Sequence, residues 1–388
     1  MEFAWSAEHE AFRASLRAFI AEHRTPALIA ELEAPASQER GPEALQFRRA
    51  LGEAGYVAMA WPPEYGGQGR GALYSFLLAE ELAYWGLPFD RLSVHSVGAS
   101  IMEFGSEQQK NDWLPKILSG DMTLAIGYTE PDAGTDLAAL KTRAVRDGDE
   151  WVLNGQKIFT SGAHVSTHIW LAARTDPTAP KHRGISMFVF PLNTPGVSVR
   201  PLYTMGRIRT NETFYEDVRI PAAAMVGEQN RGWYIVAHAL DFERVAVGPY
   251  SPLQRMLDDV VAYLKRERPA TLRDPAVRVA LAEAKLDVEI ARALATTNAA
   301  MIEHGLVPTM QASMSKVWAS DAQYRIANTV LDLLGPAGAL QRESGTAAPL
   351  NGAIEEAWRG SPIGRFGAGT NDIQRRIIAT RGLGLPRE

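Results

Sequence analysis

Two short segments of this 388-residue chain place hydroxyl, glycine and aromatic residues close enough together to bind a ligand. The first, Thr129–Asp136, holds one glycine, one proline and two threonine hydroxyls in eight residues. Such a loop offers N–H and O–H donors to the polar edge of a ligand. The second, Phe159–Gly162, is an aromatic ring followed by two hydroxyls, which could flank a flat heterocycle. Taken alone, each segment is better explained as an ordinary loop or strand end.

Two further segments could supply charge and acid–base chemistry. Residues 367–375 lead from glycine-rich backbone into a helix start, where free N–H groups and the helix dipole attract a polarised oxygen. Thr370 could equally be a simple N-cap. Glu243 lies beside Phe242 and Val245, which would desolvate its carboxylate and raise its pKa toward neutrality, as a general base requires. A surface glutamate beside Arg244 is the more common outcome for such a residue.

Composition excludes several other kinds of site. The net charge of -5 argues against a protein that binds nucleic acid mainly through phosphates. The absence of cysteine excludes disulfides, thiolate nucleophiles and Cys-ligated zinc or iron–sulfur clusters. His164 and His168 are not in helical geometry, so no metal site is expected. The acidic start and the lack of a long apolar run predict no leader or membrane helix, and we expect a cytoplasmic protein.

The hydrophobic pattern predicts helices, then strands, then helices, which is an α+β fold with three domains. Residues 1–123 read as an N-terminal α-helical domain, with Ser6 as an N-cap and a capping box at Ser106 and Gln109. Residues 124–232 read as an antiparallel β-barrel or sandwich, in which Asn154-Gly155 predicts a two-residue hairpin turn. Residues 233–388 hold long helices with short connections, which indicate a bundle.

In this order the four segments resemble the acyl-CoA dehydrogenase flavoprotein family over nearly the whole chain. The matching motifs are Pro63–Gly67, Thr129–Pro131 with Ala133–Asp136, Asn154–Lys157, Phe214–Pro221 and Gly369–Arg375. The resemblance implies a helical N-terminal domain, a β-domain and a C-terminal four-helix bundle, with FAD held between the β-domain and the bundle. It also implies an enzyme that removes hydrogens from Cα and Cβ of an acyl-CoA and passes electrons to an electron-transfer flavoprotein.

The resemblance also implies roles for individual residues. Those implied to bind the cofactor are Ile126, Tyr128, Thr129, Thr135, Phe159, Thr160, Ser161, Thr370 and Asp372. Those implied to bind the substrate are Thr135, Asp241, Arg244 and Gly369. The N–H of Ala368 and the ribityl 2′-hydroxyl of FAD would stabilise the enolate oxygen that forms when the α-proton leaves.

One departure from the family pattern identifies the base. Many members carry the catalytic glutamate immediately before the Gly-Thr of the last motif, where this chain has Ala368. A branch typified by isovaleryl-CoA dehydrogenase instead carries it on a bundle helix, in an Asp-x-Glu-Arg context that Asp241–Arg244 matches. The resemblance therefore implies that Glu243 is the catalytic base.

Two other departures concern assembly. Lys265–Pro269 and Asp332 replace family residues that often contact FAD across a subunit interface. In these two replacements the chain resembles subunits that assemble as pairs of unequal chains in steroid-degrading bacteria. We therefore expect a homodimer or homotetramer, or a heterotetramer with a paralogue. The alternatives are a flavin oxidase or monooxygenase on the same fold, or a non-catalytic subunit of an unequal pair. The presence of Glu243 argues against the monooxygenase and the non-catalytic subunit, and rapid reoxidation of the reduced flavin by oxygen would favour the oxidase.

Overall fold

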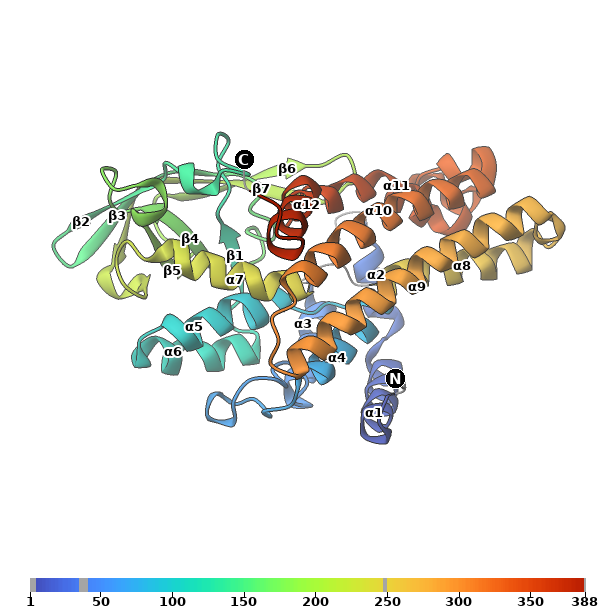
Figure 1. Cartoon of the computed structure of the whole chain (residues 1–388), viewed down its shortest axis with the longest axis horizontal. Helices are drawn as coiled ribbons and strands as arrows, with labels where there is room; N and C mark the ends of the chain where they lie inside the picture. The colour runs from blue at the N-terminus through green and yellow to red at the C-terminus, as the bar shows by residue number, and fades with distance from the viewer. Residues whose placement is uncertain (1–4, 35–40, 247–249, 387–388) are drawn as a thin grey trace.

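The structure is a computed structural model that describes residues 5–34, 41–246 and 250–386, and for residues 240–246 it describes the backbone alone. Helices fill the N-terminal part of the chain, a sheet fills the middle and long helices fill the C-terminal part (Figure 1). The predicted fold class is confirmed. No helix in the described ranges is both long and apolar enough to cross a membrane.

The described residues of the N-terminal part form six α-helices, of which the first four share one hydrophobic core and the last two pack in another core with strands of the sheet. They are α1 (Ala7–His23), α2 (Pro26–Glu33), α3 (Pro42–Glu53), α4 (Ala72–Tyr84), α5 (Ala99–Phe104) and α6 (Glu107–Ser119). Ser6 caps α1 by accepting a hydrogen bond from the N–H of His9, and the predicted capping box of Ser106 and Gln109 opens α6. A π-helical segment, η2 (Leu92–Gly98), leads directly into α5 and was not predicted.

The middle part is one sheet of eight strands. They are β1 (Leu124–Gly127), β2 (Arg143–Asp147), β3 (Glu150–Lys157), β4 (His168–Arg174), β5 (Ile185–Pro191), β6 (Val197–Tyr203), β7 (Arg209–Pro221) and β8 (Met225–Val226). The order across the sheet is β6-β7-β3-β2-β4-β5-β8, with β1 on β4. The β1–β4 and β2–β4 pairs are parallel, and the others are antiparallel.

The predicted hairpin turn at Asn154-Gly155 is wrong, because β3 runs straight through both residues. The turn lies one step earlier, between β2 and β3, where Asp147 pairs with Glu150. Gly155 is instead needed at a shift in the β3–β7 register, where its φ is +152°. A Cβ at this position would lie 2.7 Å from the Cα of Thr142, so only glycine fits without a backbone shift.

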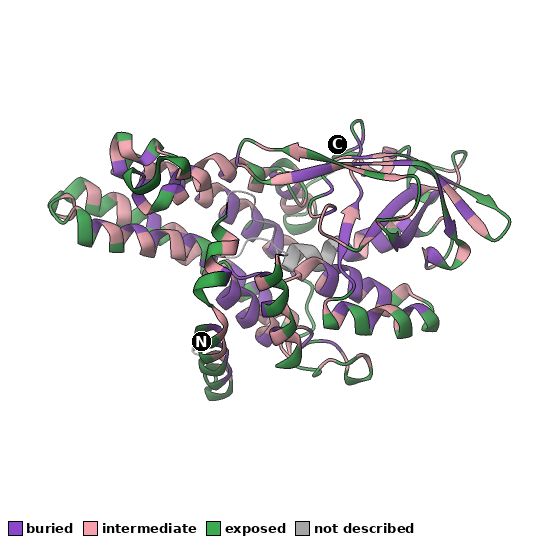
Figure 2. Ribbon diagram, turned by 180° about the vertical axis from the view of Figure 1, so that it is seen from behind, coloured by how far each residue is buried: buried purple, intermediate pink, exposed green. Residues whose placement is uncertain are grey.

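The described residues of the C-terminal part are built around four long helices. They are α7 (Gly232–Ala246), α8 (Ser251–Glu267), α9 (Pro275–Glu303) and α10 (Thr309–Leu334), followed by the short α11 (Ala353–Gly360) and α12 (Asn371–Ile377). Buried aliphatic side chains from α8, α9 and α10 form a shared core. Helix α7 contacts η2, α5, β5 and α10, so it joins the three parts of the molecule. Strands β1, β4 and β5 are largely buried, whereas β2 and β6 are mostly exposed or half-buried, and the outer helices alternate buried and exposed faces (Figure 2).

Candidate active site

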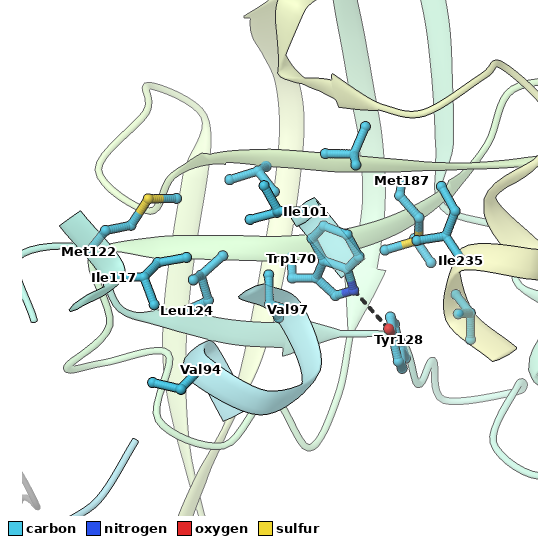
Figure 3. Close-up of a cluster of buried hydrophobic side chains, with 14 of the residues drawn as sticks. Val94, Val97, Ile101, Ile117, Met122, Leu124, Tyr128, Trp170, Met187 and Ile235 are labelled. Carbon is cyan, nitrogen blue, oxygen red and sulfur yellow. Dashed lines mark hydrogen bonds between the residues drawn. The ribbon is translucent and has the colours of Figure 1, made fainter. Parts of the chain in front are cut away.

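The first predicted segment begins at the end of β1, where a buried hydrogen bond fixes Tyr128. The indole N–H of Trp170 on β4 donates to the Tyr128 hydroxyl oxygen at 2.7 Å (Figure 3). Both side chains belong to a core that also contains Val97 of η2 and Ile235 of α7. Helices from two parts of the chain therefore hold Tyr128 in place against the sheet. Ile126, two residues earlier on β1, is half-buried and packs against the same core.

A buried ion pair fixes the loop that follows Tyr128. The ammonium of Lys157, at the end of β3, lies 2.8 Å from a carboxylate oxygen of Glu130 and donates to the Tyr128 carbonyl at 3.1 Å. The Glu130 carboxylate also accepts from the N–H groups of Lys141 and Thr142, at 2.6 and 2.8 Å. Burial lowers the pKa of Lys157 to about 8 despite Glu130. Burial opposes ionisation of Glu130 too, but the nearby ammonium and the N–H donors keep its pKa below the usual value, so the pair is ionised at neutral pH.

The second predicted segment lies at the same edge of the sheet. The N–H of Ile158 donates to the Thr129 carbonyl at 2.9 Å, which joins the two segments directly. Phe159 has a φ of +58° and exposes 58 % of its surface, so a left-handed turn presents the ring to solvent. Thr160 is buried and bonded to Asn211, whereas Ser161 is exposed, with its hydroxyl 3.0 Å from that of Thr210. Thr135 is exposed on the intervening loop.

The third predicted segment is a tight loop held by buried polar side chains. Ala368 and Gly369 both have left-handed backbones, with φ of +53° and +80°. The amide of Gln374 donates to the Ala368 carbonyl at 3.1 Å and accepts from the Ser313 hydroxyl at 2.8 Å. Thr370 is the N-cap of α12, which agrees with the simpler of the two hypotheses for it, and Asp372 is exposed in the first turn.

Contacts just upstream bring this third segment toward the β-domain. The guanidinium of Arg359, at the end of α11, donates to the Met205 carbonyl at 2.6 Å in the β6–β7 turn. Gly206 approaches Gly360 so closely that a Cβ at Gly206 would lie 2.5 Å from the Gly360 Cα. The same turn leads into Thr210, which contacts Ser161. These contacts link the three predicted segments through neighbouring elements.

The fourth predicted segment lies near the C-terminal end of α7. The side chains of Asp241, Glu243 and Arg244 lie outside the described residues. The residues on either side of them are described, however. His238 lines a cavity, and Ser251, at the start of α8, donates through its N–H to Glu80 of the same cavity at 3.1 Å. Helix α7, which carries Glu243, therefore contributes to the cavity wall through His238.

This cavity has a volume of about 790 Å³ and lies between the N-terminal helices and the bundle. Its walls come from α4, η2, α5, α7, α9 and α10. Most of the wall is apolar, and it includes Trp61, Phe76 and Met102. Several charged or titratable side chains interrupt the apolar surface, namely Glu80, Arg91, His95, Glu103 and His238. The size and composition of the cavity suit an organic ligand with polar substituents.

Comparison with known proteins identifies the class to which this fold and site belong. Family models of the acyl-CoA dehydrogenase N-terminal, middle and C-terminal domains match residues 6–121, 125–218 and 230–383. The chain therefore belongs to the acyl-CoA dehydrogenase family of oxidoreductases.

Relatives and solved structures match over the full length of the chain. It is 37% identical to acyl-CoA dehydrogenase FadE26 of Mycobacterium tuberculosis, over 100% of this chain and 99% of that protein. A structure titled "Tcur3481-Tcur3483 steroid ACAD" matches with a TM-score of 0.93 and 39% identity, over 100% of both chains. The ChsE4-ChsE5 complex from Mycobacterium tuberculosis matches with a TM-score of 0.92 and 36% identity, also over 100% of both.

The polar groups that reinforce the site were not predicted from the sequence. Lys157 and Glu130 each lie in a predicted motif, but nothing in their spacing of 27 residues indicates that they pair. The cavity residues Arg91 and His95 carry no motif at all. The one available signal is the strand alternation, which places Lys157 on the face of β3 that buries Trp151 and Leu153, where a charged residue needs a partner.

The buried carboxyl of Glu80 gives the cavity a testable pH dependence. Burial raises its pKa to about 7, although Ser251 and the nearby charge of Arg91 oppose the shift. The folded protein therefore binds more protons than the unfolded chain between about pH 4.5 and 7, and the contribution of Glu80 to stability falls as the pH rises through this window. Burial and Arg91 lower the pKa of His95 to about 4, which has the opposite effect on stability.

We expect Glu80→Gln to remove the Glu80 contribution and leave that of His95. The free energy of unfolding of the variant, relative to wild type, should rise by up to about 3 kcal/mol between pH 4.5 and 7.5. Urea unfolding of both proteins at four pH values across this range measures the difference. If the free energies of unfolding of the two proteins change equally with pH, the pKa of Glu80 is not raised and the prediction is wrong.

Proposed function

We propose that this chain binds FAD and oxidises an acyl-CoA thioester to the α,β-unsaturated ester, with Glu243 as the base. The observation that carries the proposal is the convergence of two features. One is a sheet edge that presents an aromatic ring beside hydroxyl and backbone donors. The other is a large cavity along the helix that carries Glu243. Membership of the acyl-CoA dehydrogenase family supports the same reaction class.

The sheet edge fits a flavin in both shape and hydrogen-bonding chemistry. The exposed ring of Phe159 offers an aromatic face, and Ser161 offers an accessible hydroxyl beside it. The residues that would hold FAD are Ile126, Tyr128, Thr129, Thr135, Phe159, Thr160, Ser161, Thr370 and Asp372. Bound FAD would supply the acceptor for the hydride that leaves the substrate Cβ.

Glu243 would take the α-proton. Its position follows Val236 and Ala239 by seven and four residues, and both of these are buried, so the helical repeat places position 243 on the same face of α7. Exclusion of water by the acyl group would raise the pKa of its carboxyl toward the working pH. Thr135, Asp241, Arg244 and Gly369 would position the CoA ester.

The N–H of Ala368 would donate to the thioester oxygen as negative charge develops there. The left-handed backbone of Ala368 is held by Gln374 and Ser313, so this donor is preorganised. One such donor contributes roughly 3–4 kcal/mol to transition-state stabilisation.

We propose the assembly and the kind of acyl group from the similarity of this chain to two solved structures. Two similar structures are titled as pairs of different chains, and one of the titles reads "steroid ACAD". We therefore favour a heterotetramer with a paralogue over a homodimer or homotetramer, and a bulky acyl group over a short linear one. An electron-transfer flavoprotein would then reoxidise the enzyme.

The test is to purify the chain alone and with its neighbouring paralogue, reconstitute with FAD, and add acyl-CoA esters without oxygen. We expect a yellow protein whose 450 nm band bleaches with branched or polycyclic esters, and which reoxidises slowly in air. A protein that takes up no FAD in either form would contradict the proposal. Rapid reoxidation by oxygen would instead favour the oxidase alternative.

A further inference from the structure

We infer that Lys316 is a positioning residue for the reaction, because its ammonium clamps both ends of the loop that carries the Ala368 N–H. The inference rests on the proposed function, since it takes this N–H to be the donor to the thioester oxygen. Helix α10, which carries Lys316, packs against the 3₁₀ turn η10 (Ser361–Arg365) before the loop and against α12 after it (Figure 1). Residues 366–370 therefore span two elements that rest on one helix.

The buried ammonium of Lys316 contacts the residue on each side of this loop. The side chain belongs to a residue that exposes only 2 % of its surface. Its Nζ donates to the side-chain oxygen of Asn371, which follows the loop, at 2.7 Å. It also donates to the carbonyl of Arg365, which precedes the loop, at 3.3 Å. Two bonds from one nitrogen therefore set the distance between the ends of the loop.

Asn371 is held on its other side as well. Its side-chain NH₂ group donates to the Ser320 hydroxyl at 3.0 Å and to a carboxylate oxygen of Asp321 at 3.3 Å, and both of these residues are on α10. Asn371 is buried, so these bonds fix its orientation relative to α10. The end of the loop that Lys316 holds is therefore a rigid point.

The loop depends on such support because it has little packing of its own. Phe366, Gly367 and Gly369 are exposed. Ala368 has a φ of +53°, which is unfavourable for a residue with a Cβ unless its surroundings impose it. The bond from Gln374 to the Ala368 carbonyl fixes the middle of the loop. A loop released at its ends would relax toward a more favourable φ and turn the Ala368 N–H away from its present direction.

A lysine at position 316 is otherwise an unfavourable choice. The nearby carboxylate of Asp321 lies 2.8 Å from Arg365 and 3.2 Å from Arg375, and no ion pair in the described part of the chain includes Lys316. Burial, aided by the charge of Arg375, lowers the pKa of Lys316 to about 8 although Asp321 opposes the shift, so a desolvated cation is present at neutral pH. Methionine would fill this space without the cost of burying a charge. The particular contribution of the lysine is therefore its donors to the loop.

The test is Lys316→Met at saturating FAD. We expect the limiting rate of flavin bleaching in single turnover to fall about 10- to 100-fold, because a misdirected oxyanion donor loses part of the effect of its complete removal. The substrate concentration that gives half this rate should change by less than about threefold. The matched control on the same helix is Arg325→Met, which removes an exposed cation that pairs with Asp287 and should leave the rate unchanged.

Two ligands separate loss of the donor from general damage to the fold. A 3-oxoacyl-CoA has an acidic α-proton and can bind as its enolate, whereas the matching CoA thioether has no carbonyl oxygen. Calorimetry should show that Lys316→Met weakens the first by about tenfold or more and the second by less than about threefold. Hydrogen–deuterium exchange of the protein without FAD should be faster than in wild type at residues 365–370 and unchanged in the sheet.

The absence of cysteine from the chain allows the ammonium to be restored chemically. Lys316→Cys introduces a single thiol, which is alkylated in the unfolded chain before refolding with FAD. An S-aminoethyl group rebuilds a side chain as long as lysine with its ammonium, and an S-propyl group has the same length without charge. The aminoethyl protein should recover most of the bleaching rate of wild type refolded in the same way, and the propyl protein should not.

The outcomes separate this inference from the proposed function. No FAD uptake and no turnover of any ester by wild type would overturn the proposed function. If wild type turns over, a rate of Lys316→Met within about threefold of it would overturn only the inference. Equal weakening of both ligands, or unchanged exchange at residues 365–370, would do the same. If the alkylated chains do not refold, the measurements on Lys316→Met decide by themselves.

Discussion

Replacement of Glu243 by glutamine is expected to lower the rate of substrate oxidation by at least about 10²–10⁴-fold, because loss of a general base has an effect of this size. The amide keeps the size of the side chain, so FAD and acyl-CoA should bind nearly as in wild type. Single-turnover bleaching of the flavin measures the rate. Exchange of the substrate α-protons with D₂O, followed by NMR with an ester that cannot lose a hydride, measures proton removal by itself.

The matched control is Glu283→Gln, a change on the exposed side of α9 that should leave both rates unchanged. If Glu243→Gln retains a bleaching rate within about tenfold of wild type, another group takes the proton. Loss of oxidation with normal α-proton exchange would also remove Glu243 from the role of base.

Local signals in the sequence predicted much of the fold correctly. Ser106 and Gln109 cap α6 as their spacing predicts, because the interaction involves only neighbouring residues. The hairpin predicted from Asn154-Gly155 is wrong because a contact with a distant part of the chain, and not the neighbouring residues, decides the conformation there. The conformation of Gly155 is set by its approach to Thr142 on another part of the chain, and the turn preference of the dipeptide does not decide it.

The site was only partly predictable for the same physical reason. The segments at Thr129, Phe159 and Thr370 carry family motifs, so they could be recognised one by one. The cavity is built where α4, η2 and α7 meet, and no local pattern shows which of their side chains face it. The pairing of Lys157 with Glu130 likewise depends on where β3 ends relative to the loop after β1.

Disruption of the ion pair between Lys157 and Glu130 is expected to have the second large effect. We expect Lys157→Met to lower the free energy of unfolding by about 3–5 kcal/mol, because it leaves the Glu130 carboxylate buried without its cation. It also removes the donor to the Tyr128 carbonyl, so the loop at Tyr128 and Thr129 should lose its fixed position and FAD affinity should fall. Urea unfolding of the protein without FAD measures stability, and titration with FAD measures affinity.

Two further variants show whether the buried charge is the cause. Lys157→Met combined with Glu130→Gln removes both charges and should recover a large part of the lost stability, since a neutral amide can still accept from the N–H groups of Lys141 and Thr142. Lys181→Met breaks an exposed pair with Asp136 and should lower stability by no more than about 1 kcal/mol. If Lys157→Met has an effect as small as that of Lys181→Met, the buried pair does not hold the loop, and the site must depend on Trp170 and the strand ends instead.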